Sequence, residues 1–287
     1  MLDVDGTLVA PEGPGGAGGD LMPRADEVIR TLRERGVHVV VYTNGTTHRP
    51  QHYAHELRKH GLPIADDDLI TPAVVAARFL EQHHPGASVL VIGGEGAHEP
   101  LAASGVRIVG PDTDEIDVVL VAHDERVDGR KIEAACHAIW AGAPFLATSN
   151  ARYYFRKGSR GVSLSGAVSA GIEHVTEIRP TILGKPSLVS MQAIATRTGV
   201  SIEDILVVGD DVDIEIRMGR ETGALAALVL SGTAGARGES ELAALPEDLR
   251  PHLVIPDIGH LFAVLPALAD SSTDPYAVPR GTGRSTS

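Results

Sequence analysis

The chain has 287 residues, of which 43% are hydrophobic, and it carries a formal net charge of −13 at pH 7. This apolar content is enough for one large domain or two moderate ones, and the negative charge argues against nucleic acid as a partner. Cys136 is the only cysteine, which excludes internal disulfides, and neither a signal peptide nor a membrane-spanning stretch is recognisable. We therefore expect a cytoplasmic protein with no membrane partner.

The first chemically informative feature is a pair of aspartates, Asp3 and Asp5, directly followed by Gly6 and Thr7. In an extended segment, residues i and i+2 point to the same side, so the two carboxylates converge. A D-x-D-G string is also a common turn sequence. Carboxylates this close repel each other, however, and that repulsion is usually tolerated only where a cation or a reaction needs both groups.

Only two apolar residues precede Asp3, whereas a buried strand usually has about five to six residues. We expect that the first strand continues upstream of this sequence. The alternative is a stunted first strand that holds Asp3 less firmly.

The next segments alternate between predicted helices and strands. The glycine-rich residues 11–19 predict a flexible loop close to the first motif. Helices are predicted at 24–35, 50–60 and 72–83, the first two ending at glycines. Between the first two helices, the β-branched run 39–42 predicts a buried strand that ends at Thr43, Asn44 and Gly45.

Residues 84–177 carry their own alternation of strands and helices, beginning with a strand near 89–92. Towards the end of this region, four basic residues surround the aromatic run 153–155. We interpret residues 152–160 as a surface loop with solvated charges. In an alternative hypothesis, the loop overhangs the site, and Arg156 and Arg160 contact an anionic or planar substrate.

The last third of the chain adds a lysine and an acidic cluster. Gly184, Lys185 and Pro186 precede a helix predicted at 187–198, and the apolar run 205–208 leads into Asp210 and Asp211. Short apolar runs of this kind predict strands of a parallel sheet buried on both faces, and the active site of such a sheet lies at the carboxyl ends of its strands. Residues 269–287 are rich in Ser, Thr, Pro and Gly, which predicts disorder.

The ordered set D-x-D-G-T, T-N-G, G-K-P and G-D-D-x-D-x-E resembles the four signature motifs of the haloacid dehalogenase (HAD) superfamily of phosphatases. The spacing is similar to that of the type IIA, NagD-like branch, which also holds phosphoglycolate phosphatases. The resemblance implies an α/β fold, with a doubly wound, Rossmann-like parallel-sheet core and an inserted α/β cap domain. We expect the core at 1–83 and 178–268, the cap at 84–177 and the tail at 269–287.

The resemblance also implies roles for individual residues. The catalytic residues would be Asp3 as nucleophile, Asp5 as acid and base, and Lys185 as the neutralising charge. The transferred phosphoryl group would be bound by Thr43, Asn44, Gly45 and Lys185. Mg²⁺ would be held by Asp3, the backbone carbonyl of Asp5 and Asp210, with either Asp211 or Glu215 as a further acidic ligand. Mg²⁺ prefers a few carboxylates together with phosphate and water.

The predicted function is Mg²⁺-dependent hydrolysis of a small phosphomonoester through an aspartyl-phosphate on Asp3. One alternative is a catalytically weak or inactive member that binds a phosphorylated metabolite, which the short first strand and Glu215 would favour. The other is a different reaction on the same scaffold, and Asp5 argues against carbon–halogen cleavage because it serves a phosphate-ester leaving group. The substrate stays open, and a homodimer is possible.

Overall fold

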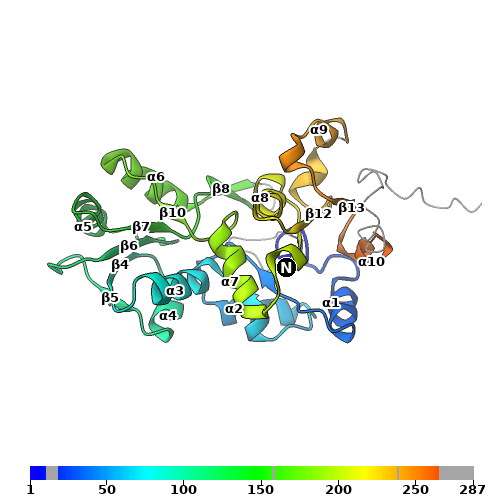
Figure 1. The fold of residues 1–287 in the computed structure, drawn as a ribbon, viewed down its shortest axis with the longest axis horizontal. Helices are drawn as coiled ribbons and strands as arrows, with labels where there is room; N and C mark the ends of the chain where they lie inside the picture. Colours follow the sequence, from blue (N-terminus) through cyan, green and yellow to red (C-terminus); the bar gives the residue numbers. More distant parts are fainter. Residues whose placement is uncertain (11–18, 157–158, 238, 265–287) are drawn as a thin grey trace, which may run out of the picture.

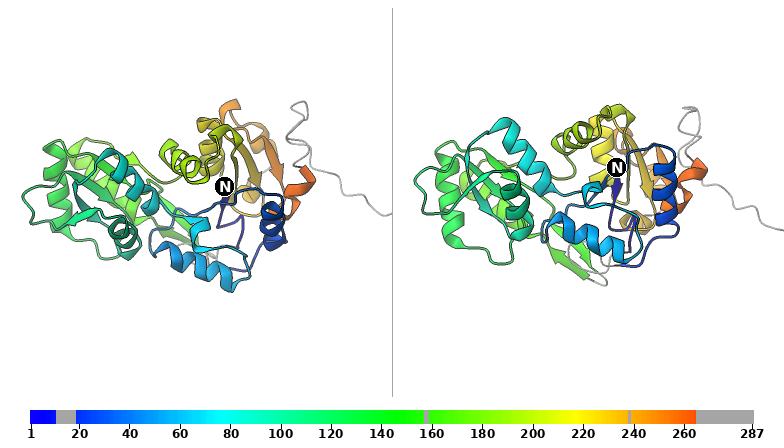
Figure 2. Two further views of the ribbon diagram at one scale, coloured as in Figure 1. Left: turned by 60° about the horizontal axis from the view of Figure 1, so that its bottom comes forward. Right: turned by 90° about the horizontal axis from the view of Figure 1, so that it is seen from below.

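The computed structural model describes residues 1–10, 19–156, 159–237 and 239–264. The predicted tail at 269–287, and the predicted loop at 11–19 apart from its last residue, lie outside the described residues. The described chain forms two lobes, each built around a parallel sheet (Figures 1 and 2). None of the described helices is both long and apolar enough to cross a membrane.

The first lobe contains a six-stranded parallel sheet in the order β13-β12-β11-β1-β2-β3. Its strands are β1 (Leu2–Asp3), β2 (Val41–Tyr42), β3 (Leu69–Ile70), β11 (Leu206–Gly209), β12 (Leu225–Val229) and β13 (Leu253–Ile255). β1 lies between β2 and β11, as expected for a doubly wound sheet. Although β1 is short, its backbone is paired on both sides: Leu2 N–H donates to Val40 O (2.8 Å) and Val208 N–H donates to Met1 O (2.9 Å).

Helices cover both faces of this sheet. They are α1 (Ala25–Glu34), α2 (Pro50–Lys59), α3 (Pro72–His83), α7 (Leu188–Thr198), α8 (Arg217–Thr222), α9 (Glu239–Ala243) and α10 (Leu261–Val264). The predicted helices at 24–35, 50–60, 72–83 and 187–198 are thereby confirmed. The apolar faces of α1 and α2 pack on one side of the sheet, and those of α3 and α7 pack on the other.

The second lobe, the cap domain, contains a five-stranded parallel sheet in the order β10-β7-β6-β4-β5. Its strands are β4 (Ser88–Ile92), β5 (Arg107–Val109), β6 (Val118–Val121), β7 (Phe145–Ala147) and β10 (Thr181–Ile182). Its helices are α4 (Glu95–Ala103), α5 (Gly129–Trp140) and α6 (Leu164–Thr176). Because β10 pairs with β7, the cap sheet continues past the predicted boundary at residue 177.

One predicted loop is wrong in its secondary structure. The segment around the basic residues 152–160 contains β8 (Tyr153–Arg156) and β9 (Ser159–Val162), which pair antiparallel as a hairpin. Its aromatic run at 153–155 and Val162 suit cross-strand pairing, whereas the basic residues favoured a loop.

The two lobes are joined by a continuous core. Helix α3 packs against the cap helix α4 as well as against α7 of the first lobe. Gly96 of α4 is buried against the carbonyl oxygens of Thr46 and His48, and the His123 N–H donates to Thr46 Oγ1 (3.3 Å). The cap therefore rests on the loop that directly follows Asn44 and Gly45.

Candidate active site

The strand order brings the predicted motifs to one edge of the first sheet. Asp3 is the last residue of β1, Thr43 directly follows β2, and Asp210 directly follows β11. In the register, Leu2 pairs with Val208 and with Val41. Because these strands are parallel neighbours, their carboxyl ends and the side chains that follow them lie together.

Lys185 enters the same place from the loop between β10 and α7. Its side chain is only 2% exposed, and its ammonium contacts the Asp3 carboxylate, Glu215 Oε1 (2.7 Å) and the carbonyl oxygen of Tyr42 (3.1 Å). An ammonium has three protons, so each of them has an acceptor. Burial disfavours this charge, but the Asp3 and Glu215 carboxylates outweigh that effect and raise the pKa of Lys185 above its ordinary value.

The Asn44 side chain holds the backbone of Lys185. Its Nδ2 donates to Lys185 O (2.8 Å), and its Oδ1 accepts from Lys185 N–H (2.9 Å). These two bonds position the lysine, and the predicted contact of the Asn44 amide with a phosphoryl oxygen stays a prediction. Thr43 Oγ1 accepts from Gly45 N–H (3.1 Å), so the Thr43 hydroxyl keeps its proton for another acceptor.

Three buried carboxylates form a group that could hold a cation. Oxygens of Asp3, Asp210 and Glu215 lie within 4.8 Å of one another. Asp211 is used differently, because its Oδ1 accepts from the N–H of Asp213 (2.7 Å) at the start of a π-helical turn spanning Val212–Ile216. Such turns are often found at functional sites. Among the described residues, the geometry thus groups Glu215, and not Asp211, with the other acids.

Small residues make room for these acids. A Cβ at Gly209 would overlap the side chain of Glu215, and one at Gly232 would overlap Asp210. Gly6 has a φ of +77°, and a Cβ there would lie 2.8 Å from Asp210 Cγ. Close approach, together with positive φ at Gly6, therefore requires glycine at these positions.

Thr233 is a site residue that the sequence analysis missed. Its N–H donates to Asp210 Oδ2 (2.6 Å), and its hydroxyl donates to Asp210 O (2.7 Å). Nearby, Ser231 Oγ donates to Gly6 O (2.7 Å) and so connects the first motif to this turn. The available signal was the S-G-T turn that follows the apolar run of β12, at the same edge of the sheet.

The negative charges of the buried acids raise one another's pKa. Burial, followed by the charges of Asp3 and Asp210, raises the pKa of Asp5 to about 7. Burial and the charge of Asp3 likewise raise the pKa of Asp210 to about 7. Burial also raises the pKa of Glu215, although Lys185 opposes this shift. More negative charge is gathered here than one lysine neutralises, which is the electrostatic signature of a cation site.

The predicted specificity residues are not placed by the structure. The backbones of Arg156 and Arg160 belong to the β8–β9 hairpin, but their side chains lie outside the described part of the chain. Their proposed contact with substrate stays a prediction.

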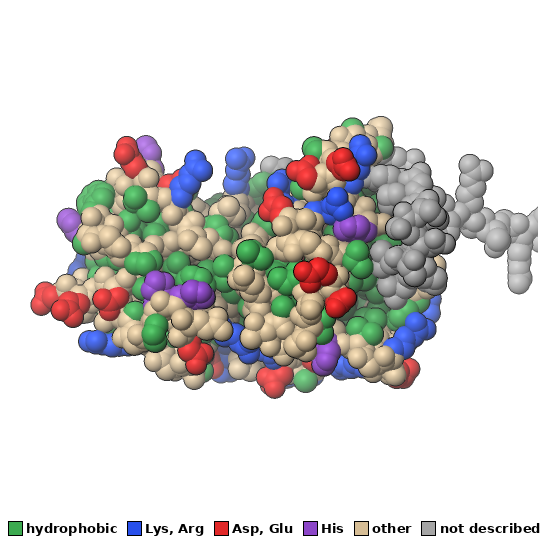
Figure 3. All heavy atoms as spheres, viewed as in Figure 1, with side chains coloured by type: hydrophobic (Ala, Val, Ile, Leu, Met, Phe, Trp, Pro, Cys, Tyr) green, Lys and Arg blue, Asp and Glu red, His purple; other side chains and the backbone are tan. Residues whose placement is uncertain are grey.

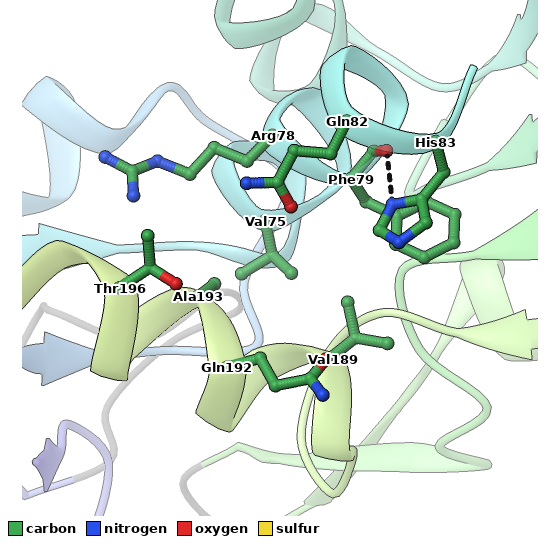
Figure 4. Close-up of a pocket in the computed structure, with 9 residues that line it drawn as sticks. All are labelled: Val75, Arg78, Phe79, Gln82, His83, Val189, Gln192, Ala193 and Thr196. Carbon is green, nitrogen blue, oxygen red and sulfur yellow. Dashed lines mark hydrogen bonds between the residues drawn. The ribbon is translucent and has the colours of Figure 1, made fainter. Parts of the chain in front are cut away.

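Two surface hollows are lined by residues other than those of the four motifs. A cavity of about 40 Å³ lies where α3 and α7 meet and is lined by apolar Val75 and Val189 and by polar Gln192, among others (Figure 4). A wider crevice of about 350 Å³ lies in the cap beside Gly93 and Lys131. On the face drawn in Figure 3, acidic and basic side chains are interspersed.

Two family models match the chain. Residues 1–107 match the model described as haloacid dehalogenase-like hydrolase, and residues 182–261 match the HAD-hydrolase-like model. They contain the motif residues of the first sheet, and the segment between them contains most of the cap. The chain therefore belongs to the haloacid dehalogenase superfamily of hydrolases.

Individual relatives define the branch. The chain is 29% identical over 292 residues to chronophin of Rattus norvegicus, covering 98% of this chain and 92% of the relative. It is 27% identical over 242 residues to the sugar-phosphatase AraL of Bacillus subtilis, covering 84% and 86%. Its structure superposes on NagD from E. coli K-12 with a TM-score of 0.77 at 25% identity, covering 89% of this chain and 94% of NagD. As predicted, the branch is type IIA, NagD-like.

The fold is also shared with a phosphatase whose structure contains magnesium. The glycerol phosphate phosphatase of Mycobacterium tuberculosis, crystallised with magnesium, superposes with a TM-score of 0.79 at 24% identity, covering 91% of this chain and 75% of that one. At this identity the likeness concerns the fold, which agrees with the predicted core and inserted cap.

Proposed function

We propose that this protein is a phosphatase that hydrolyses a small phosphomonoester, with Mg²⁺, through an aspartyl-phosphate on Asp3. The observation that carries the proposal is the position of the Asp3 carboxylate. It lies at the end of the central strand, against the Lys185 ammonium and within the three-carboxylate group. A nucleophile, a fixed positive charge and a cation site are the parts that phosphoryl transfer needs.

The donor set fits Mg²⁺. Asp3, Asp210 and Glu215 offer carboxylate oxygens within 4.8 Å of one another, and Mg²⁺ takes oxygen ligands and few carboxylates. We propose Asp3 and Asp210 as the direct protein ligands, with Glu215 as the further acid in place of Asp211. When bound, the cation supplies neutralising charge for the phosphoryl oxygens.

In the first step, a carboxylate oxygen of Asp3 attacks phosphorus, and the bond from phosphorus to the leaving oxygen breaks. The Asp5 carboxyl gives its proton to that oxygen, and a pKa near 7 keeps a protonated population available at neutral pH. In the second step, Asp5 takes a proton from water as the water oxygen attacks phosphorus, and the bond from phosphorus to the Asp3 oxygen breaks, which releases phosphate and restores Asp3.

Lys185 and the second motif bind the transferring group. The Lys185 ammonium neutralises charge on a phosphoryl oxygen beside Asp3, and the Thr43 hydroxyl donates to another. Asn44 contributes indirectly, since its amide fixes the Lys185 backbone. The cap excludes bulk water and restricts substrates to small molecules.

The names of the relatives support a small phosphomonoester as substrate but do not agree on one compound. They act on sugar phosphates, glycerol phosphate or nucleotides by their names, and all of these are small phosphomonoesters. The predicted cytoplasmic location and homodimer stay predictions.

The test is phosphate release from p-nitrophenyl phosphate, sugar phosphates, glycerol phosphate and nucleotides, with Mg²⁺ and with chelator. We expect Mg²⁺-dependent release by wild type and at least a ~10³-fold loss in Asp3→Asn, because the nucleophile is removed. Asp211→Asn is the matched control, expected to keep most of the activity. Activity retained in Asp3→Asn would contradict the proposal, and ligand-induced stabilisation without turnover would favour a binding protein.

A further inference from the structure

Tyr42 contacts the Lys185 ammonium from within the protein core. Tyr42 is fully buried at the end of β2, next to Asp3 in the register. Its carbonyl oxygen accepts from Lys185 Nζ (3.1 Å), and its ring centroid lies 5.3 Å from the same nitrogen. This separation is within the range of cation–π attraction. One residue therefore contacts the ammonium through both its backbone and its ring.

The hydroxyl of Tyr42 reaches the segment that carries Lys185. It lies 2.7 Å from Ser190 Oγ, which donates to Leu183 O (2.8 Å) and accepts from Ser187 Oγ (3.0 Å). A serine hydroxyl has one proton, and Ser190 gives it to the Leu183 carbonyl. The Tyr42 hydroxyl is therefore the donor to Ser190. The resulting network ties residues on both sides of Lys185 to β2.

We propose that Tyr42 and Ser190 are positioning residues that hold the Lys185 ammonium in place for phosphoryl transfer. This inference rests on the proposed function. Lysine is a point charge on a flexible stem of four carbons, so its catalytic value depends on how well it is held. A charge that is already in place when the phosphoryl group reacts needs no reorganisation at that moment.

An apolar side chain at either position would satisfy packing alone. Both residues are instead polar at 0% exposure, and each polar group buried without a partner would cost about 1–3 kcal/mol. The Tyr42 hydroxyl bonds to the Ser190 hydroxyl, which in turn bonds to Leu183 O and Ser187 Oγ on either side of Lys185. This is the arrangement expected for a support of Lys185, whose own contacts span 143 residues to Tyr42 and 182 to Asp3.

The test compares wild type, Tyr42→Phe and Ser190→Ala in Mg²⁺. Tyr42→Phe keeps the ring and the carbonyl, and it leaves Ser190 with its other two partners. In both Tyr42→Phe and Ser190→Ala we expect kcat to fall roughly 3–10-fold, corresponding to one hydrogen bond, with KM unchanged within about twofold. The calorimetric dissociation constant of orthovanadate, which mimics the five-coordinate transition state, should rise by the same factor, while that of inorganic phosphate should not.

Two further variants separate positioning from folding. Ser169→Ala removes a buried hydroxyl of α6 that donates within its own helix to Ser165 O (2.7 Å). This variant should change neither kcat nor the dissociation constant of orthovanadate. The Tyr42→Phe, Ser190→Ala double variant should bind orthovanadate no more weakly than Ser190→Ala does, since the two hydroxyls share one hydrogen bond. A merely structural role would lower the Tm and the active fraction without changing vanadate affinity.

The outcomes distinguish this inference from the function on which it rests. Equal vanadate affinity in all variants would overturn the inference, even when wild type releases phosphate and Asp3→Asn does not. A wild-type protein that neither releases phosphate nor binds vanadate would overturn both. Weaker vanadate binding in Tyr42→Phe and Ser190→Ala, but not in Ser169→Ala, would support the inference.

Discussion

Lys185→Met removes a buried charge while keeping most of the side-chain volume. The Lys185 side chain is 2% exposed, and its partners Asp3 and Glu215 are 10% and 3% exposed. Breaking a buried ion pair costs about 3–5 kcal/mol, because the remaining charge stays out of water. For a chain of this size, with about 2 °C of Tm per kcal/mol, we expect a fall of roughly 6–10 °C.

The size of this fall should depend on pH through Glu215. Burial already raises the pKa of Glu215 well above 4.5, although Lys185 opposes the shift, and loss of the ammonium removes that opposition. A carboxyl whose pKa is higher in the folded than in the unfolded state loses stability as pH rises from the unfolded pKa through the folded one. The calorimetric Tm difference from wild type, measured in chelator, should therefore be small at pH 5 and largest at pH 8.

Mg²⁺ gives the second check. A cation held by the carboxylates replaces part of the missing charge, so saturating Mg²⁺ should reduce the Tm difference at pH 8. Lys131→Met is the matched control: this half-buried lysine of α5 donates to the carbonyl of Val91 (3.3 Å), and its loss should shift the Tm by less than about 2 °C. A Lys185→Met deficit that is equal at both pH values, with and without Mg²⁺, would refute the electrostatic account.

Gly96→Ala should lower the Tm by roughly 2–6 °C, although alanine favours helix, because its Cβ would lie 2.6 Å from the His48 carbonyl oxygen. Gly110→Ala is the control, because no atom lies within 4 Å of the added Cβ. A Tm for Gly96→Ala above that of wild type would show that the cap contact adjusts to the added Cβ without loss of stability. In chelator, wild type should lose stability between about pH 4 and pH 7, because the pKa values of Asp5 and Asp210 are raised to about 7 in the folded protein. Thermal unfolding with and without Mg²⁺ checks this, since Mg²⁺ should restore stability at the upper end; a Tm that rises with pH in chelator would contradict it.

The sequence by itself determined the elements and the convergence of the motifs. The helix predicted at 72–83 matches α3, because a proline at its start and an apolar stripe are local signals. Asp3, Thr43 and Asp210 could be placed together because each stands at the end of a buried parallel strand, and parallel strands end at the same edge.

Only the tertiary structure decided how these side chains are used. It grouped Glu215 rather than Asp211 with the acids, turned the Asn44 amide towards the Lys185 backbone, and joined Tyr42 to Ser190 across 148 residues of sequence. Periodicity and spacing report which face of an element is apolar, but they do not report where distant segments meet within a few tenths of an ångström. A hydrogen bond depends on that last separation, so its partners become known only when the chain is folded.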